Sequence, residues 1–465
     1  MLFPEASKVN HVEKGPIGKT LLRFAIPVLL SQLLQELYNI ADCMVLGHFA
    51  GEYALAASGI SGMLLSVLIN FFIGFSSGVS VITSRLFGAY KYDRLKQTMT
   101  AVFRLAISAG LFMTLFGYVL SGWVLSLLHS PAEVKPYALL YLHICVLGLT
   151  AQLIYNVGTA ILRSLGNTRT PLIFFLASVL INLGLDALLV IGLKTGIAGA
   201  AAATLFSQWV LAILILGYLM NLDSSVSLSL KGKGLPAGEL LLILKDGIPA
   251  GLQAVFMSIS SMLIQIHINS FGPDAMAGMT VYAKLEGCMY LPSFAYGIAL
   301  TGFVGQNLGA GQYERIRKSV RLSLATMIAT ILPLSLVLMA ASPVLLRLFT
   351  SDPGILHNAH EAVVYTFPVY VIYAINQIWL GAIKGLGNTS YPMVCTLLCY
   401  SLFRVIWCRI LIPHFPSMRI VYLSYDVSFF LMLALLVPVY MRSRKTETFS
   451  DDSELFSPLK RRESH

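Results

Sequence analysis

Charged residues are scarce in this sequence of 465 residues: only 12% are Asp, Glu, Lys or Arg. A soluble domain usually carries about 25%. Hydrophobic residues make up 57% of the chain, and its mean hydropathy is +0.76. The shortage of charge excludes an ordinary soluble protein and predicts an all-α, polytopic membrane protein.

Cysteine and catalytic clusters are also lacking. The six cysteines include no CxxC pair and lie almost wholly within apolar runs, so neither a disulfide framework nor a zinc site is indicated. The loops contain no His/Asp/Glu cluster of the kind that a membrane enzyme needs, and we expect neither enzymatic activity nor a cofactor. No cleavage pattern follows the first apolar stretch, so we expect it to remain as a membrane span.

Twelve apolar stretches are long enough to cross a bilayer, which takes about 20 residues. They lie at about 21–46, 54–83, 95–123, 137–161, 171–191, 197–220, 248–268, 275–304, 320–341, 363–383, 391–412 and 420–441.

The two halves of the chain are related by an internal repeat. The motif that begins Gly88-Ala recurs at Gly309-Ala, and Leu165-Gly-Asn-Thr recurs at Leu386-Gly-Asn-Thr, both with an offset of 221 residues. Because each repeat holds six spans, the repeat predicts two six-helix bundles related by a pseudo-two-fold axis along the membrane normal. The predicted divisions are an N-terminal arm (1–20), an N-lobe (21–220), a cytoplasmic connector (221–245), a C-lobe (246–441) and a disordered tail (442–465).

The basic residues predict the orientation of the chain. With both termini in the cytoplasm, only Lys135, Lys194, Arg347 and Arg419 fall in outer loops, and the many other loop lysines and arginines lie inside. The net charge of +10 therefore reflects the orientation of the chain in the membrane. We expect the basic residues to contact membrane lipid headgroups rather than nucleic acid.

The first span carries a stripe of polar residues that is energetically costly to place in a membrane. Gln32, Gln35, Glu36, Asn39 and Asp42 fall within an arc of roughly 120° on one helix face. A carboxylate near the centre of a membrane helix costs about 2.5–3.5 kcal/mol on insertion scales, so Asp42 is a candidate functional residue. The alternative is a structural hydrogen bond to a neighbouring helix.

A second carboxylate lies in the fifth span, where Asn182 and Asp186 stack one turn apart. Thr204 follows in the sixth span. Asp42, Asn182 and Asp186, with backbone and hydroxyl oxygens, form a hard-oxygen set suited to Na⁺. The two carboxylates could instead share a proton, or could make two separate interhelical hydrogen bonds.

Further polar residues inside the spans are candidates for a substrate cavity. They are Gln35, Tyr38, Asn39, Gln152, Asn156, Gln253 and Glu286. Glu36 either extends this polar path or pairs with a neighbour. Lys284 does not share a helix face with Glu286, and of the two we expect Glu286 in the cavity. Arg404 in the eleventh span needs a partner, and we expect its role to be structural.

Three groups of motifs resemble the multidrug and toxic compound extrusion (MATE) transporters. They are Leu37-Tyr-Asn-Ile-Ala-Asp-Cys-Met-Val-Leu-Gly-His, the Gly88-Ala loop with its Gln306-Asn-Leu-Gly-Ala-Gly partner, and the paired Leu-Gly-Asn-Thr loops. The resemblance covers about residues 15–442. It implies a two-lobed, twelve-helix antiporter of the cell membrane that exports organic cations or other amphipathic compounds in exchange for Na⁺ or H⁺, here expected to be a monomer.

The DinF-like branch of that family implies specific roles for residues of the N-lobe. Its cation site corresponds to Asp42, Asn182, Asp186 and Thr204, and its helix-bending proline to Pro27. Gln253 stands nearest to the place where the other branch has an acidic residue, so a carboxylate site in the C-lobe is not expected. The alternative function is that of a lipid-linked saccharide flippase of the same superfamily.

Overall fold

The chain folds almost entirely into helices. The computed structural model describes every residue except 1–11, 13–14, 128–130, 232–234, 236 and 446–465, and the described residues contain no β-strand. Most of the predicted N-terminal arm and of the predicted tail therefore lies outside the described residues.

Seven α-helices make up the first half of the chain. They are α1 (Ile17–Val45), α2 (Glu52–Gly88), α3 (Tyr92–Leu127), α4 (Lys135–Val146), α5 (Leu149–Ser164), α6 (Arg169–Asp186) and α7 (Ile197–Met220). Short π-helical segments extend α1 over Leu46–Ala50 and α6 over Ala187–Gly192. α4 and α5 meet at a bend of 47° and correspond to the single stretch predicted at 137–161.

Eight α-helices make up the second half. They are α8 (Ala237–Asn269), α9 (Pro273–Gly309), α10 (Tyr313–Leu345), α11 (Pro353–Thr366), α12 (Tyr370–Gly385), α13 (Ser390–Thr396), α14 (Phe403–Leu411) and α15 (Met418–Lys445). 3₁₀ segments follow α10 (Leu346–Leu348) and join α11 to α12 (Phe367–Val369), and a π-helical segment (Leu397–Leu402) joins α13 to α14. α8 begins inside the stretch predicted as a connector.

The prediction of a twelve-span, all-α membrane protein is confirmed. Among the described residues, eleven helices are long and apolar enough to cross a membrane, and the bent α4–α5 pair makes the twelfth span. Six of these spans come from each half of the chain.

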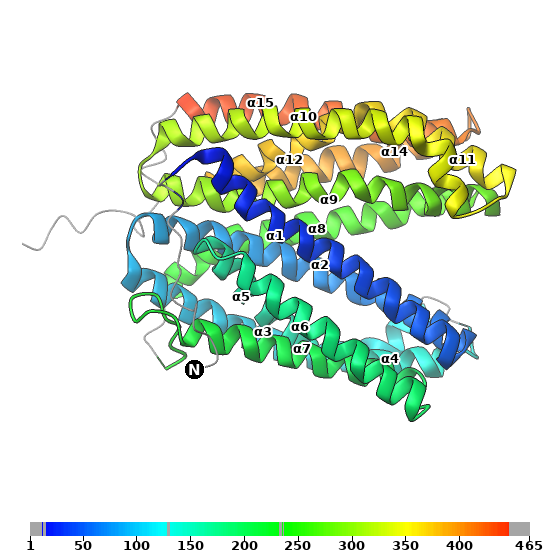
Figure 1. Cartoon of the computed structure of the whole chain (residues 1–465), viewed down its shortest axis with the longest axis horizontal. Coiled ribbons are helices and arrows are strands. Elements are labelled where there is room, and N and C mark those ends of the chain that lie inside the picture. The colour runs from blue at the N-terminus through cyan, green and yellow to red at the C-terminus, as the bar shows by residue number, and fades with distance from the viewer. Residues whose placement is uncertain (1–11, 13–14, 128–130, 232–234, 236, 446–465) are drawn as a thin grey trace, which may run out of the picture.

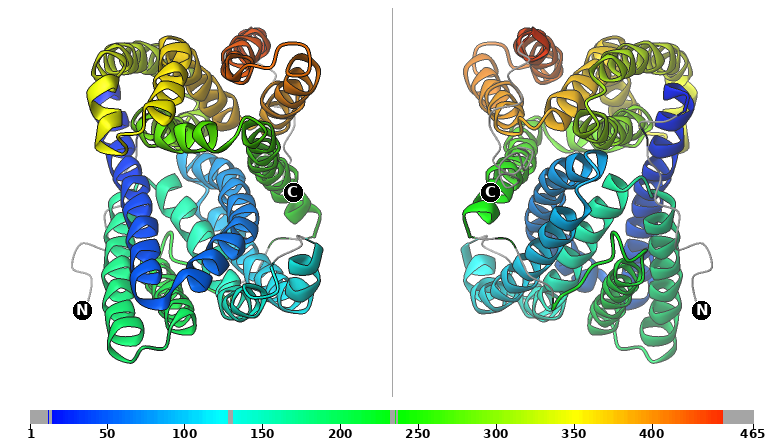
Figure 2. Two further views of the ribbon diagram at one scale, coloured as in Figure 1. Left: turned by 90° about the vertical axis from the view of Figure 1, so that its right-hand side faces the viewer. Right: turned by 90° about the vertical axis from the view of Figure 1, so that its left-hand side faces the viewer.

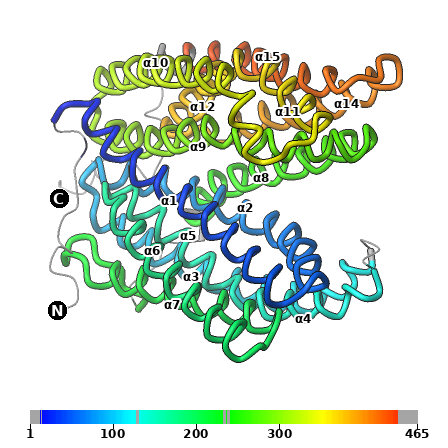
Figure 3. Tube along the Cα trace, turned by 45° about the vertical axis from the view of Figure 1, so that its right-hand side comes forward, coloured from blue at the N-terminus to red at the C-terminus, as the bar shows by residue number. Residues whose placement is uncertain are grey.

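The two halves form two bundles that meet at one end and diverge at the other (Figures 1 and 3). α1 begins and α15 ends at the end where the bundles meet. We call this the basic end, because α3 and α10 begin there with basic residues such as Arg94 and Arg317 in their first turns. We call the opposite end, where the bundles diverge, the open end.

Glycines allow the two bundles to touch closely. Gly74 and Gly78 on α2 face α8, which carries Gly247 and Gly251 at the same four-residue spacing. A Cβ atom on Gly78 would lie 2.6 Å from the backbone oxygen of Asp246, closer than real Cβ atoms approach. Small residues at i and i+4 let two membrane helices pack backbone to backbone. The contact between α2 and α8 therefore depends on the absence of side chains.

Polar contacts add to this interface. The Asn70 side chain on α2 donates to the Ser258 hydroxyl on α8 (2.9 Å). Nearer the basic end, the Gln306 side chain on α9 donates to the backbone oxygen of Ser164 on α5 (2.6 Å) and accepts from the backbone N–H of Val12 (3.1 Å). The N-lobe, the C-lobe and the segment before α1 are thus joined through one glutamine.

α1 and α8 each cross from one bundle to the other. Leu21 and Phe24, in the first turns of α1, belong to the hydrophobic core of the C-lobe, whereas Tyr38 packs against the core of the N-lobe. In α8 the order is reversed, with Ile243 in the N-lobe core and Ile264 in the C-lobe core. Seen from the open end, α1 runs alongside both bundles (Figure 2, left). The predicted lobes, 21–220 and 246–441, therefore do not coincide with the two packed bundles at α1 and α8, because each of these helices contributes to both hydrophobic cores.

Candidate functional site

Two carboxylates approach each other inside the N-lobe. Asp42 lies near the end of α1, and Asp186 is the last residue of α6. Asp186 is fully buried (0% exposed) and Asp42 is half-buried, and the two are close enough to interact electrostatically. The Oδ1 atom of each is buried and has no hydrogen-bond partner among the described residues. A cation or a proton bound between them would satisfy both atoms.

Asn182 connects Asp186 to Thr204. Its amide nitrogen donates to Asp186 Oδ2 (3.1 Å), and its amide oxygen accepts from the backbone N–H of Thr204 (3.2 Å). Asn182 and Asp186 are one turn apart on α6, so both side chains project toward α7. The Tyr38 hydroxyl lies 3.3 Å from Thr204 Oγ1. The structure thus brings together the four predicted coupling residues and one predicted cavity residue, Tyr38.

The atoms of this cluster fit either Na⁺ or a proton. Carboxylate, hydroxyl and amide oxygens are the hard donors that Na⁺ takes, whereas softer metals prefer nitrogen or sulfur. Among the described residues no three His, Cys, Asp or Glu side chains gather at one point. A sodium ion would therefore be held by Asp42 and Asp186 together with neutral oxygens such as Thr204 Oγ1.

The cluster also includes two residues that the sequence did not suggest. Tyr141 and Cys145 on α4 are buried, and both interact electrostatically with Asp42. They are one turn apart, and their spacing places them on one face of a helix. Such a pair is too common in apolar helices to indicate a site from sequence alone.

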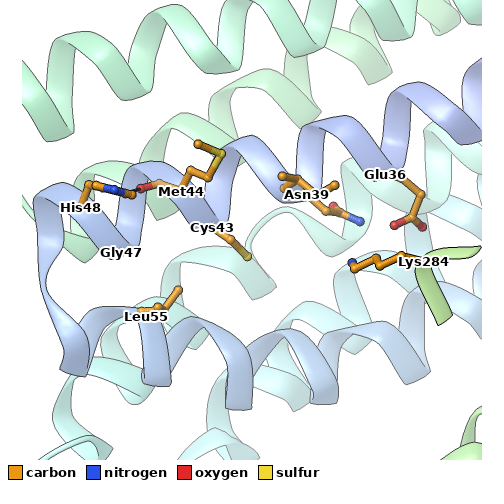
Figure 4. A pocket seen from close by; sticks show the side chains of 9 residues that line it. Glu36, Asn39, Cys43, Met44, Gly47, His48, Leu55 and Lys284 are labelled. Carbon is orange, nitrogen blue, oxygen red and sulfur yellow. Dashed lines mark hydrogen bonds between the residues drawn. The ribbon is translucent and has the colours of Figure 1, made fainter. Parts of the chain in front are cut away.

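A cavity of about 610 Å³ lies between α1, the start of α2 and α9 (Figure 4). Its lining is mainly apolar, as is typical of sites for small molecules. The lining residues are Glu36, Asn39, Ile40, Cys43, Met44, Gly47, His48, Leu55 and Lys284. The cavity therefore combines an apolar wall with two opposite charges, one from each lobe.

The predicted stripe on α1 divides between this cavity and the N-lobe cluster. Glu36 and Asn39 line the cavity, whereas Tyr38 and Asp42 approach α6 and α7. The Gln35 side chain donates to Asn39 Oδ1 (3.3 Å) between the two surfaces. For Glu36, this position favours the first of its two predicted roles, an extension of the polar path.

Three other predicted cavity residues lie elsewhere. Asn156 on α5 donates to the backbone oxygen of Gln152 (2.9 Å), and both are half-buried. Gln253 is buried and donates to the Thr396 hydroxyl (2.9 Å), a contact between α8 and α13 within the C-lobe. The cavity between α1 and α9 is lined by none of the three.

Glu286 points away from the cavity and into the C-lobe. It accepts a hydrogen bond from the Tyr370 hydroxyl (3.3 Å) on α12. Lys284, two residues earlier on the opposite face of α9, lines the cavity instead. Residues two apart on a helix differ in direction by about 200°, so only one of them can face α1. The structure therefore differs from the prediction, because Lys284 and not Glu286 lines this cavity.

Inside the C-lobe, Arg404 interacts with two carboxylates. Its guanidinium lies over the Tyr425 ring, 4.2 Å from the centroid, and its Nε donates to Ser428 Oγ (2.8 Å). It interacts electrostatically with Glu286 and with Asp426, which is 7% exposed. Asp426 is not among the residues predicted from the sequence, although a lone Asp in the last apolar span gives the same signal as Asp42.

Comparison with known proteins places this architecture in a family. The MatE family model matches residues 27–188 and again residues 249–410, one match in each half of the chain. The chain therefore belongs to the MatE family, the MATE transporters. The matched segments also agree with the repeat seen in the sequence.

Relatives and solved structures extend the comparison over most of the chain. The chain is 25% identical over 440 residues to "Probable multidrug resistance protein YoeA" of Bacillus subtilis, covering 92% of this chain and 94% of that protein. It is 26% identical to "Probable multidrug resistance protein NorM" of Thermotoga maritima, with 87% of each covered. The fold is similar to a crystal structure of MATE in the bent conformation (TM-score 0.86, 21% identity, 93% of this chain and 96% of that one). It is equally similar to an outward-facing multidrug resistance MATE transporter (TM-score 0.86, 21% identity, 95% and 99%).

Proposed function

We propose that this MATE transporter is a secondary antiporter that exports organic cations or other amphipathic compounds in exchange for Na⁺ or H⁺. The observation that carries the proposal is the pair Asp42 and Asp186, each with a buried oxygen that lacks a partner among the described residues. Similarity to relatives named as multidrug resistance proteins supports the substrate class.

The charge distribution supports an assignment of sides. The basic end is the cytoplasmic side by the rule that inner loops carry Lys and Arg, so both termini are cytoplasmic and the protein spans the cell membrane. The open end is then the outer side. The chain adopts an outward-facing arrangement in which the cavity between α1 and α9 is one surface for substrate.

Ion binding would act on transport through α1. Asp42 lies in the half of α1 that packs on the N-lobe, and the first turns of the helix pack on the C-lobe. Pro27 is buried between these two parts and cannot donate a backbone hydrogen bond, which makes this point the easiest place for α1 to bend. Neutralising Asp42 removes like-charge repulsion from Asp186 and changes how the second half of α1 packs. Coupling follows if the ion and the substrate favour different packings of α1.

The proposed partners are membrane lipids and small-molecule cargo. Lipids contact the apolar outer faces of the spans, and the anionic headgroups of the inner leaflet lie beside the basic loops. A monomer suffices, because each chain contains both bundles and the cleft between them. The carboxylates of the N-lobe suit cationic or neutral cargo and do not favour the flippase alternative.

The test is dye efflux from proteoliposomes. Purified protein is reconstituted, and ethidium efflux is measured with Na⁺ and pH gradients imposed separately. We expect one gradient to drive efflux and Asp42→Asn to abolish that dependence. Asp93→Asn, a change at an exposed position near the start of α3, is the matched control. Full gradient-driven efflux by the Asp42→Asn variant would contradict the assignment of the coupling site.

A further inference from the structure

The cavity between α1 and α9 contains a feature that coupling by Asp42 and Asp186 does not use. Its two charged lining residues have opposite signs and come from opposite lobes, Glu36 from the N-lobe and Lys284 from the C-lobe. Figure 4 shows both side chains directed into the space between the two helices, with Asn39 beside them. Both are exposed.

Glu36 and Lys284 face the same space without forming an ion pair with each other. Among the residues that the structure describes, neither Glu36 nor Lys284 makes an ion pair within 4.0 Å or a side-chain hydrogen bond. An ionisable residue at membrane depth is costly unless it serves a cavity or a ligand, and here both residues line the same cavity.

We propose that Glu36 and Lys284 together select amphipathic zwitterions. A substrate ammonium group would bind near Glu36, a substrate carboxylate near Lys284, and the apolar body against Ile40, Met44 and Leu55. This inference rests on the proposed function and narrows it, because a cavity built for simple organic cations would not present a lysine. The volume of about 610 Å³ falls within the range of cavities that hold drug-sized molecules.

The lysine also gives selectivity by exclusion. A ligand that lacks a carboxylate leaves the Lys284 ammonium unpaired beside its own positive charge, whereas a zwitterion neutralises both protein charges at once. Discrimination of this kind needs a repulsive element as well as an attractive one. Glu36 alone attracts every cation, and Lys284 then separates zwitterions from the rest.

Two dyes provide a matched test. Rhodamine 110 is a zwitterion, and rhodamine 123 is its cationic methyl ester, so the pair differs only at the carboxylate. Binding is measured by fluorescence anisotropy with the purified full-length protein in detergent at pH 7, without any ion gradient. We expect Lys284→Met to weaken rhodamine 110 binding about tenfold, the size of one charged contact. The same variant should bind rhodamine 123 as well as the wild type does, or more tightly.

Further variants separate binding from folding. Lys284→Arg should keep most of the affinity for rhodamine 110, and Glu36→Gln should weaken both dyes. Lys194→Met, at an exposed lysine that does not line the cavity, is the matched control and should change neither. Retained rhodamine 123 binding shows that the Lys284→Met protein is folded.

Two results with the Lys284→Met variant would overturn the inference. One is unchanged rhodamine 110 binding by Lys284→Met, and the other is an equal loss of both dyes, which would assign Lys284 to the conformation of the cleft. If the wild type binds the ester but not the acid, the zwitterion inference fails while the proposed function stands. If it binds neither dye, the proposed substrate class fails as well.

Discussion

The Tyr38 hydroxyl on α1 lies 3.3 Å from the Thr204 hydroxyl on α7. This is a direct side-chain hydrogen bond between the helix that crosses the two lobes and the helix that completes the N-lobe cluster. It sits beside Asp42 and Asp186, both of which interact electrostatically with Tyr38. The position of α1 against the N-lobe is therefore linked to the state of the two carboxylates.

Removal of this hydroxyl should weaken ion dependence without unfolding the protein. We expect Tyr38→Phe to weaken the packing of α1 against α7 by about 0.5–1.5 kcal/mol, which is the net contribution of a typical hydrogen bond to stability. The ion concentration that half-activates efflux should shift by about two- to twelvefold. Tyr53→Phe, at an exposed tyrosine stacked on Tyr137, is the control and should leave the curve unchanged. If Tyr38→Phe leaves the dependence of efflux on ion concentration unchanged, the hydrogen bond between Tyr38 and Thr204 has no part in coupling.

Neutralising Asp186 should stabilise the resting protein and abolish coupling. The fully buried Asp186 carboxylate lies near a second carboxylate, and buried like charges destabilise each other. We expect Asp186→Asn to raise the Tm of the purified protein, because an amide can still accept from Asn182, and to remove gradient-driven efflux. A lower Tm with normal efflux would assign Asp186 a structural role. Asn182→Ala should lower the Tm instead, because it leaves Asp186 Oδ2 without its donor.

The fold could be read from the sequence because the membrane imposes simple rules. Backbone groups in lipid must be paired internally, so apolar stretches of sufficient length become helices. Twelve stretches predicted twelve spans, and the repeat at 221 residues predicted two bundles. Sequence periodicity could not predict that α1 and α8 cross between bundles, because an apolar face does not identify the helix that it meets.

The site could be predicted only where polar residues follow helical spacing. Asn182 and Asp186 are one turn apart, so their contact follows from local geometry, and Thr204 was placed beside them by family resemblance. The division of the α1 stripe between two surfaces depends on how α1 is rotated against α9. For the same reason, nothing local indicated that Lys284 rather than Glu286 faces the cavity.

Adding one methyl group at the lobe interface should shift the balance between conformations. A Cβ atom at position 78 meets backbone atoms of α8 at 2.6 Å, and backbone cannot move aside as a flexible side chain can. We expect Gly78→Ala to destabilise the closed basic end and so favour the state in which the open end is closed. Cys43, exposed in the cavity, then reports the change as slower labelling by an impermeant maleimide.

The labelling experiment uses a chain in which Cys43 is the only cysteine. Gly62→Ala is the control, because nothing lies within 4 Å of a Cβ atom at that position on the same helix. Alanine favours a helix over glycine by up to about 1 kcal/mol, so the control also tests for simple helix stabilisation. Equal labelling rates in the two variants would show that the α2–α8 contact does not set the conformation.

Arg404 should stabilise the C-lobe by compensating the negative charges of Glu286 and Asp426. It is the cation that interacts with Glu286 and Asp426, and its guanidinium lies over Tyr400, Tyr425 and Phe429. Removing one partner of a buried charged group costs about 3–5 kcal/mol, because the other charge is left uncompensated. We expect Arg404→Met to lower the Tm of the purified protein strongly. The double variant with Asp426→Asn should recover part of the loss, because it removes one of the two carboxylates that arginine compensates. Additive losses in the double variant would show that Asp426 is stabilised by something other than Arg404.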